Sequence, residues 1–291
     1  MSYIVNTEQA QAWNGPEGAH WARNQDRWNA VNAGFNTPLL DAARIAGDSR
    51  VLDLGCGSGQ TTRLAALRAP EGHAVGLDLS GPMLAGARAR AEGEGVANVA
   101  FVQGDAQAYD FGPGAFDAAI SRYGVMFYAD PVAAFGNVGR ALRPGGRLAF
   151  VCPADAALNE WVAAVASLRD IVPVGDFGRP GLPGMFSLAA PDRIREVLTA
   201  AGFTGVAIRQ VEAYGEWGHG AADAAEFVLG TGPGRHLMEQ ADAPARTRAR
   251  RTLTEHLRAH EAADGTVRLL STSWLVTADR PAGPPAACPS A

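Results

Sequence analysis

The sequence of 291 residues predicts a doubly wound α/β fold, in which a mostly parallel sheet lies between two layers of helices. Three observations lead to this prediction. Short apolar segments rich in valine, leucine and alanine alternate with helix-like segments between residues 50 and 279. The first apolar segment runs into three glycines on alternate positions, and each of the next two leads into an aspartate. Such alternation is typical of parallel strand–helix–strand units, whose polar residues gather at one edge of the sheet.

The first predicted unit is a strand over Val51–Leu54, followed by a turn and a helix that Ser58 is expected to cap. The turn contains three glycines: Gly55, Gly57 and Gly59. Without a Cβ they allow a tight turn whose backbone can approach a nucleoside cofactor closely. Asp53 precedes the first glycine by two residues and is expected to meet the ammonium group of a ligand.

The spacing of the glycines separates two classes of cofactor. A dinucleotide turn needs Gly-x-Gly-x-x-Gly, which would place its third glycine at position 60, where this chain has Gln60. The spacing therefore disfavours a nicotinamide-dependent oxidoreductase, which stays open as an alternative. A P-loop needs Gly-Lys-Ser/Thr, and it is excluded because the chain contains no lysine.

Two further acids follow the second and third predicted strands. The strand over Ala74–Asp78 ends in a carboxylate that can accept hydrogen bonds from both hydroxyls of a ribose. Ser80 is expected to cap the next helix, which runs to about Gly93. A third strand over Val99–Gln103 leads to Asp105. A lone aspartate at such a place is often a turn former, but three acids beside successive strands predict a cofactor site.

The later elements continue the alternation. Strands are expected over four ranges: Phe116–Ser121, Leu148–Val151, Val206–Val211 and Ser273–Thr277. One helix is expected to open at Asp130-Pro131 and to stop at Arg143–Gly146, and another to cover Pro191–Ala201.

Three stretches depart from this alternation and are expected to cover the carboxyl ends of the strands. They are the N-terminal residues 1–36, the long connection 153–190 and a helical insert at 221–261. All six tryptophans lie outside residues 50–152. We expect aromatic residues to line a substrate cavity there: Trp13, Trp21, Trp28, Trp161, Trp217, Tyr123 and Phe127. The alternative is that they only join the cover to the core.

The sequence resembles the class I S-adenosylmethionine-dependent methyltransferases. The resemblance to the class rests on Val51–Thr62. Two further segments, Ile120–Phe127 with the following Asp130-Pro131 and Trp13–Trp21, are similar to a UbiE-like small-molecule group of actinobacterial type. It implies a seven-stranded Rossmann-like sheet whose last strand runs antiparallel between the fifth and sixth. It also implies S-adenosylmethionine as cofactor. The residues expected to bind it are Asp53, Gly55, Cys56, Gly57, Gly59, Asp78, Leu79, Met83, Asp105, Ala106 and Ser121.

The resemblance also implies individual roles. Leu79 and Met83 would line the adenine, and Asp105 would accept from its amino group. Tyr123 would face the methyl group, because it follows the fourth strand. Pro153 stands where this group is expected to have tryptophan, so the substrate does not carry over from its members.

Composition limits the remaining classes. No run of about 18 apolar residues and no secretory signal pattern is present, so neither membrane attachment nor secretion is expected. Three scattered cysteines fit the cytoplasm. A net charge of −5 argues against a nucleic-acid partner, and the arginines at 246–251 are expected to form a solvated helix face. His256, His260 and Glu261 share a helical spacing, but no metal site is expected.

Together these observations predict an S-adenosylmethionine-dependent methyltransferase that acts on a small, apolar or aromatic metabolite by in-line displacement. His20 is the leading candidate for a general base and Tyr123 the second. A structural role for His20 stays open, as does a protein that binds the cofactor without catalysis. The core is expected over residues 37–152 and 191–279, with a disordered tail at 280–291. The oligomeric state stays open, with a homodimer among the alternatives.

Overall fold

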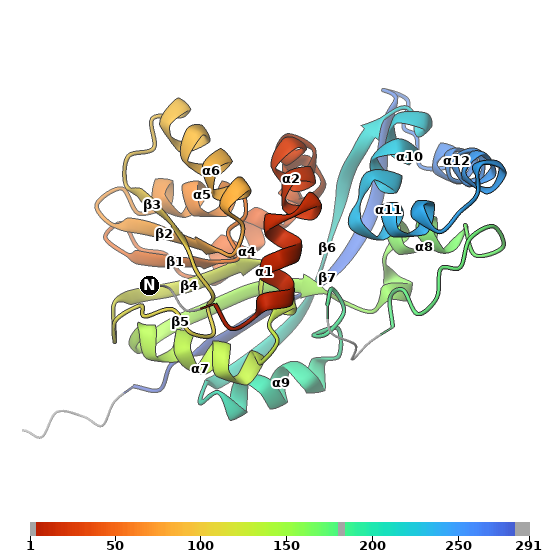
Figure 1. The fold of residues 1–291 in the computed structure, drawn as a ribbon. Helices are drawn as coiled ribbons and strands as arrows, with labels where there is room; N and C mark the ends of the chain where they lie inside the picture. Colours follow the sequence, from red (N-terminus) through yellow and green to blue (C-terminus); the bar gives the residue numbers. More distant parts are fainter. Residues whose placement is uncertain (1–3, 180–183, 283–291) are drawn as a thin grey trace, which may run out of the picture.

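The computed structural model describes residues 4–179 and 184–282, and its centre is one seven-stranded sheet (Figure 1). The strands lie in the order β3-β2-β1-β4-β5-β7-β6. Their bounds are β1 Arg50–Leu54, β2 His73–Asp78, β3 Val99–Gln103, β4 Phe116–Arg122, β5 Leu142–Pro153, β6 Thr204–His219 and β7 Thr266–Asp279. Strand β7 is antiparallel to both of its neighbours, whereas β1 to β5 pair in parallel. The predicted fold class, including the inserted antiparallel strand, is confirmed.

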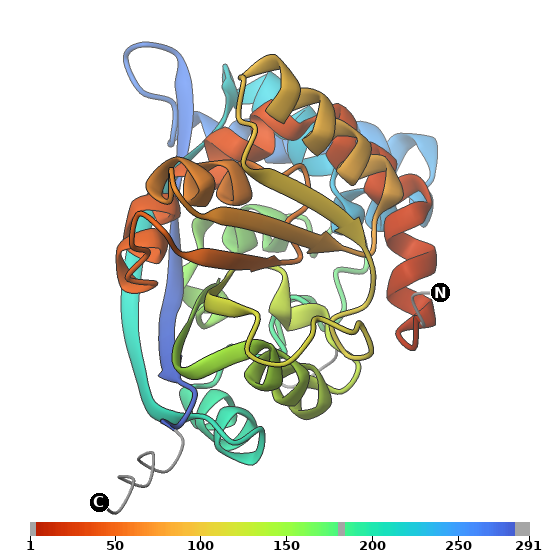
Figure 2. The same ribbon diagram turned by 90° about the vertical axis from the view of Figure 1, so that its left-hand side faces the viewer.

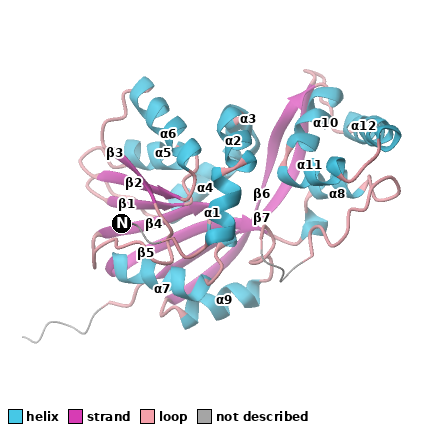
Figure 3. Cartoon of the chain, in the orientation of Figure 1, coloured by secondary structure: helices cyan, strands magenta, loops and turns pink. Residues whose placement is uncertain are grey.

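Two layers of helices cover the sheet (Figure 3). One layer holds α4 (Asn36–Ala42), α5 (Gln60–Arg68) and α6 (Gly81–Gly93), and the other holds α7 (Pro131–Ala141) and α9 (Pro191–Ala200). Alternation along the strands supplies both layers, because successive side chains point to opposite faces. In β1, Val51 packs in the cluster with α4 and α5, while Leu52 and Leu54 pack in the cluster with α7 and α9.

The sequence predicts serine caps for two of these helices, α6 and α5, and the structure shows one of them. Ser80 accepts from the Met83 N–H at 3.3 Å, as predicted for α6. The prediction that Ser58 caps α5 is wrong. Gly59 takes the N-cap position with φ of 73°, and no side chain caps this helix. The turn ends at Gly59, which has a left-handed backbone and directly precedes Gln60, the first residue of α5. Ser58 therefore lies inside the turn.

Strands β6 and β7 are much longer than predicted, with 16 and 14 residues. They extend beyond the sheet as a hairpin that carries the insert (Figure 1). The insert forms α10 (Ala221–Gly230), α11 (Gly232–Glu239) and α12 (Ala243–Arg258), which share an apolar cluster with α8 (Glu160–Ala166). The arginines at 246, 248, 250 and 251 are exposed on α12, and Arg250 pairs with Glu226 at 2.7 Å.

The N-terminal residues form α1 (Thr7–Asn14), α2 (Pro16–Arg23) and α3 (Gln25–Asn32), followed by a 3₁₀ turn at Ala33–Phe35. Figure 2 shows α1 beside the carboxyl edge of the first strands. The other 3₁₀ turns are Val125–Phe127 after β4 and Ala156–Leu158 after β5. No helix within the described ranges is long and apolar enough to cross a membrane. Most of the tail expected to be disordered, residues 283–291, lies outside the described residues.

Candidate active site

The glycine turn after β1 forms one wall of the site from backbone alone. Gly55 and Gly57 have φ of 63° and 55°, a left-handed conformation that side chains rarely adopt. A Cβ on Gly55 would lie 2.7 Å from the Gly124 Cα, and one on Gly57 would lie 2.8 Å from the Met83 Cε. Gly55 is therefore required both by its backbone conformation and by the backbone of Gly124. Gly57 is required mainly by its conformation, because the Met83 methyl group can move.

Asp78 closes this wall at the end of β2. One carboxylate oxygen accepts from the Gly57 N–H at 2.7 Å and the other from the Ser80 N–H at 2.8 Å. Burial raises the pKa of Asp78, and the backbone donors oppose this shift. Each oxygen keeps a free lone pair, so the carboxylate can still accept from two ribose hydroxyls.

Three residues expected to bind the cofactor stand behind the wall. Asp53 is fully buried, and its Oδ2 accepts from the hydroxyls of Thr61 and Thr62, both at 2.7 Å. Burial raises its pKa to about 6. Ser121 donates to the Leu54 carbonyl at 2.6 Å. Neither of these residues nor Gly59 lines the cavity. They brace the turn, and a direct contact of Asp53 with an ammonium group is not supported by its position.

Asp105 lines the cavity, but donors from the cover already surround its carboxylate. One oxygen accepts from the backbone N–H groups of Val5 and Asn6 at 3.0 and 2.8 Å, and the other from that of Gln107 at 2.9 Å. The side-chain amide of Gln107 lies 3.2 Å from both oxygens. A carboxylate offers about four lone-pair sites, so the expected adenine contact would have to replace one of these bonds.

The cover is fastened to the core beside the same edge. Asn14 of α1 donates to the Leu79 carbonyl at 2.9 Å and accepts from the Gly81 N–H at 3.0 Å. The hydroxyl of Ser80 donates to the Trp13 carbonyl at 2.7 Å. These bonds hold α1 over the end of β2.

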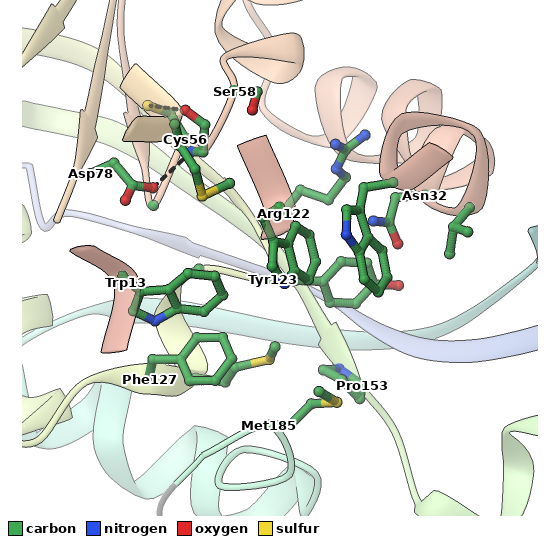
Figure 4. A pocket seen from close by; sticks show the side chains of 18 of the residues that line it. Trp13, Asn32, Cys56, Ser58, Asp78, Arg122, Tyr123, Phe127, Pro153 and Met185 are labelled. Carbon is green, nitrogen blue, oxygen red and sulfur yellow. Dashed lines mark hydrogen bonds between the residues drawn. The ribbon is translucent and has the colours of Figure 1, made fainter. Parts of the chain in front are cut away.

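A cavity of about 220 Å³ runs from the glycine turn to the underside of the cover. Figure 4 shows Cys56, Ser58 and Asp78 on one side of it and Arg122, Tyr123 and Asn32 on the other. The predicted cofactor residues in its wall are Gly55, Cys56, Gly57, Asp78, Leu79, Met83, Asp105 and Ala106. All seven predicted substrate residues are also in its wall: Trp13, Trp21, Trp28, Tyr123, Phe127, Trp161 and Trp217. The chain thus brings eight of the eleven predicted cofactor residues together with all seven predicted substrate residues.

The aromatic residues form a connected cluster in the cover half of this cavity. Trp21 and Trp28 stack with ring centroids 3.8 Å apart and an interplanar angle of 2°. Trp13 meets Trp21 and Phe127 edge-on, at 5.8 and 5.4 Å. Trp28 meets Trp217 edge-on at 6.1 Å. The rings therefore pack against one another, and all five line the cavity.

The two residues expected to act as base occupy different places. His20 does not line the cavity. It packs behind the tryptophans, edge-on to Trp28 and stacked on Phe227, and burial lowers its pKa. This position does not support a role as general base. Tyr123 lines the cavity and shares a hydrogen bond of 2.8 Å with Ser273. Burial raises the pKa of Tyr123, so its hydroxyl stays protonated at neutral pH.

Sequence reasoning missed many residues of the cavity wall, among them Asn32, Arg122, Tyr128 and Met185. Arg122 had a usable signal, because a charged residue directly after a buried strand is unusual. The others had none, since their segments reach the cavity only through the tertiary fold.

The cysteines and histidines of the described residues form neither a reactive thiol pair nor a metal site. Cys56 and Cys152 are buried free thiols, and burial raises the pKa of both. The rings of His256 and His260 lie 5.7 Å apart, and His260 Nδ1 is 3.5 Å from Glu160 Oε2. Within residues 4–179 and 184–282, no group of three or more candidate ligands could hold a metal ion.

Comparison with known proteins decides the class of this site. Residues 51–146 match a family described as a methyltransferase domain. A demethylmenaquinone methyltransferase of Thermus thermophilus is 35% identical over 174 residues, which cover 57% of this chain and 79% of that protein. The chain belongs to the class I S-adenosylmethionine-dependent methyltransferases. A trans-aconitate 2-methyltransferase of Methylobacterium nodulans is 32% identical over 215 residues, 71% of this methyltransferase and 76% of that protein.

The likeness of fold extends across nearly the whole methyltransferase. The crystal structure of the [4+2]-cyclase SpnF superposes with a TM-score of 0.59 at 18% identity, and it covers 97% of this chain and 98% of that one. The family assignment confirms the predicted enzyme class and its cofactor, S-adenosylmethionine, with a small metabolite as substrate. The nicotinamide-dependent alternative is not supported.

Proposed function

We propose that this methyltransferase methylates a flat, largely apolar, aromatic metabolite, which binds between the glycine turn and the tryptophans of the cover. The observation that carries the proposal is that one cavity joins the backbone wall of the turn to the stacked rings of Trp21 and Trp28. An apolar flat ligand gains both burial and ring stacking at such a surface.

The residues present fit S-adenosylmethionine. The two glycines leave the turn open to a nucleoside, Asp78 offers free lone pairs, and Met83 presents a thioether beside them. The cofactor supplies a methyl group on a sulfonium, which makes that carbon an electrophile. Gly55, Gly57, Asp78, Leu79 and Met83 would hold it at this end of the cavity.

The contribution of the chain is then to position the acceptor and to exclude water. The tryptophans and Phe127 give the cavity an apolar wall, which favours an in-line approach by restricting the acceptor and reducing the water around it. Burial keeps the hydroxyls of Tyr123 and Tyr128 protonated. The hydroxyl of Tyr123 lies 2.8 Å from that of Ser273, and with Ser273 as the donor its own proton is free for a hydrogen bond to the acceptor. A protonated phenol cannot remove the proton of the acceptor.

Two broader assignments belong to the same proposal. A cavity of about 220 Å³ under a helical cover suits a small molecule better than a nucleic acid, which needs an open basic surface. The two free buried thiols suit a reducing compartment, so we place the reaction in the cytoplasm.

Calorimetric titration tests the cofactor half of the proposal. S-adenosylmethionine and S-adenosylhomocysteine should bind and NADH should not. The Asp78→Ala variant should bind both adenosyl ligands about tenfold or more weakly, because the two hydrogen bonds from the ribose hydroxyls to the carboxylate are lost. Asp192→Ala, in the exposed first turn of α9, is the matched control and should bind normally. Binding that is indifferent to Asp78 would contradict the assignment of this residue.

A further inference from the structure

Arg122 introduces a positive charge into a cavity that is otherwise uncharged on the cover side within the described residues. It is the last residue of β4, and its side chain reaches into the cavity beside Tyr123 and Asn32 (Figure 4). Within the described part of the chain, no other arginine or histidine lines this cavity. The carboxylates in its wall, Asp78 and Asp105, belong to the cofactor side.

Two neutral amides hold the guanidinium directly, while the Asp53 carboxylate behind the glycine turn acts on it from beyond ion-pair distance. Its Nη1 donates to Asn36 Oδ1 at 2.5 Å and to Gln60 Oε1 at 2.6 Å. Among residues 4–179 and 184–282, no carboxylate lies within 4.0 Å of it, whereas arginines such as Arg147 form ion pairs. Burial lowers the pKa of Arg122 to about 10, so it is still charged at neutral pH.

The backbone beside Arg122 is strained in a way that serves the cavity. Tyr123 has φ of 61°, in the left-handed region that a non-glycine residue rarely occupies. In a regular strand, successive side chains point to opposite faces, so Arg122 and Tyr123 would diverge. The left-handed turn lets both consecutive side chains line the same cavity.

We infer that Arg122 is the specificity-determining residue of this enzyme and that it binds an anionic oxygen group, a carboxylate or phenolate, on the acceptor. This inference rests on the proposed function. Within the described residues, Nε and Nη2 make no hydrogen bond, and this pair of donors matches a carboxylate in bidentate geometry. The guanidinium is half-buried and has no carboxylate within ion-pair distance among the described residues, so an acidic acceptor would supply the missing partner on binding.

Arg122 has a second possible anionic partner, the carboxylate at the amino-acid end of S-adenosylmethionine. Figure 4 places Arg122 across the cavity from Asp78, on the side of Asn32 and Tyr123. Its bond to Gln60, the first residue of α5, also keeps it near the glycine turn. We take the acceptor as the source of the anion because Asn32 and Tyr123 flank Arg122 on the side away from Asp78, and the experiment below separates the two sources.

The test compares two probes that differ only in charge. The enzyme is saturated with S-adenosylhomocysteine and titrated with 3-hydroxy-2-naphthoate or with its neutral amide, followed by quenching of tryptophan fluorescence. The acid should bind about ten- to hundredfold more tightly than the amide. If the acid does not bind, or binds no more tightly than the amide, the inference is overturned.

Variants assign the preference to one residue. Arg122→Gln should remove the preference for the acid, and Arg122→Lys should keep part of it. Arg250→Gln, on the exposed face of α12, is the matched control and should behave as the unmodified enzyme. Thermal unfolding of both Arg122 variants checks that they fold. A preference that survives in a folded Arg122→Gln variant would also overturn the inference.

The cofactor source is tested in the same variants. S-adenosylhomocysteine carries the carboxylate, and 5′-methylthioadenosine lacks it. Both should bind Arg122→Gln as they bind the unmodified enzyme. If the variant weakens S-adenosylhomocysteine alone, Arg122 binds the cofactor and the inference fails. If S-adenosylhomocysteine does not bind the unmodified enzyme, the failure lies in the proposed function itself.

Discussion

Asp53 illustrates how a residue with a functional appearance can instead brace the site. Its carboxylate lies behind the glycine turn, bonded to two threonine hydroxyls of α5. Its other oxygen, Oδ1, is buried with no hydrogen-bond partner among the described residues. A carboxylate in this position pays for desolvation, and this is the reason its pKa rises to about 6.

This shift predicts a pH dependence of stability. The pKa of the folded state lies above the unfolded value, so the protonated form favours folding and this contribution is lost as pH rises from about 4 to 6. Asp53→Asn removes the titration and keeps an acceptor for a threonine hydroxyl. Relative to the variant, the unmodified protein should lose up to about 3 kcal/mol of unfolding free energy between pH 4 and pH 7.

Urea unfolding of both proteins at the two pH values measures this difference, and the other titrating groups cancel in the comparison. A difference that does not change with pH would show that Asp53 titrates normally.

At the scale of elements, the strand–turn–helix unit of β1 and α5 depends on separate demands for conformation and for space. Gly57→Ala violates both demands. A φ of 55° strains alanine, and the new Cβ would lie 2.8 Å from the Met83 Cε at the cofactor wall. Gly95→Ala, after α6, has φ of 69° but nothing within 4 Å of the new Cβ. Both variants should lose about 1 kcal/mol of stability.

Only Gly57→Ala should also weaken the binding of S-adenosylhomocysteine, by about tenfold, because the Met83 side chain or the ligand must move. Thermal unfolding and calorimetry measure the two effects separately. Equal ligand affinity in both variants would mean that the turn does not contact the cofactor closely.

For the whole molecule, the decisive arrangement is the contact between the N-terminal cover and the insert at the far end of the hairpin. Arg27 of α3 donates to the Trp217 carbonyl at 2.7 Å and pairs with Asp223 of α10 at 2.9 Å. Its guanidinium carbon also lies 4.2 Å from the centre of the Phe227 ring. Arg235 of α11 pairs with Glu17 of α2 in the same interface. These contacts close the cavity on the side away from the sheet.

Arg27→Ala should therefore loosen the cover. We expect a loss of about 1–2 kcal/mol of stability and faster hydrogen exchange in α2 and α3, while the strands of the core stay protected. Arg193→Ala, which removes an exposed pair with Glu196 on α9, is the control and should change neither quantity measurably. Exchange in α3 that equals that of the unmodified protein would show that other contacts hold the cover.

Local patterns in the sequence determine much of this protein. The positions of the first strands, the glycine turn, the position of Asp78 and the caps at Ser80 and Asp130 follow from features within a few residues of one another. Apolar segments, glycines and capping residues act through the backbone nearby, so they can be read without knowing what packs against them. The family resemblance adds the antiparallel last strand, and the sheet pairing confirms it.

Only the tertiary structure decided how side chains from distant segments meet. It placed Asp53 and His20 outside the cavity, surrounded Asp105 with donors from the N-terminus, and extended β6 and β7 far past their predicted ends. It also brought Arg122 beside Asn36 and Gln60, which are 86 and 62 residues away in the chain. Packing and desolvation depend on such long-range neighbours, and no local pattern records which of them a side chain will face.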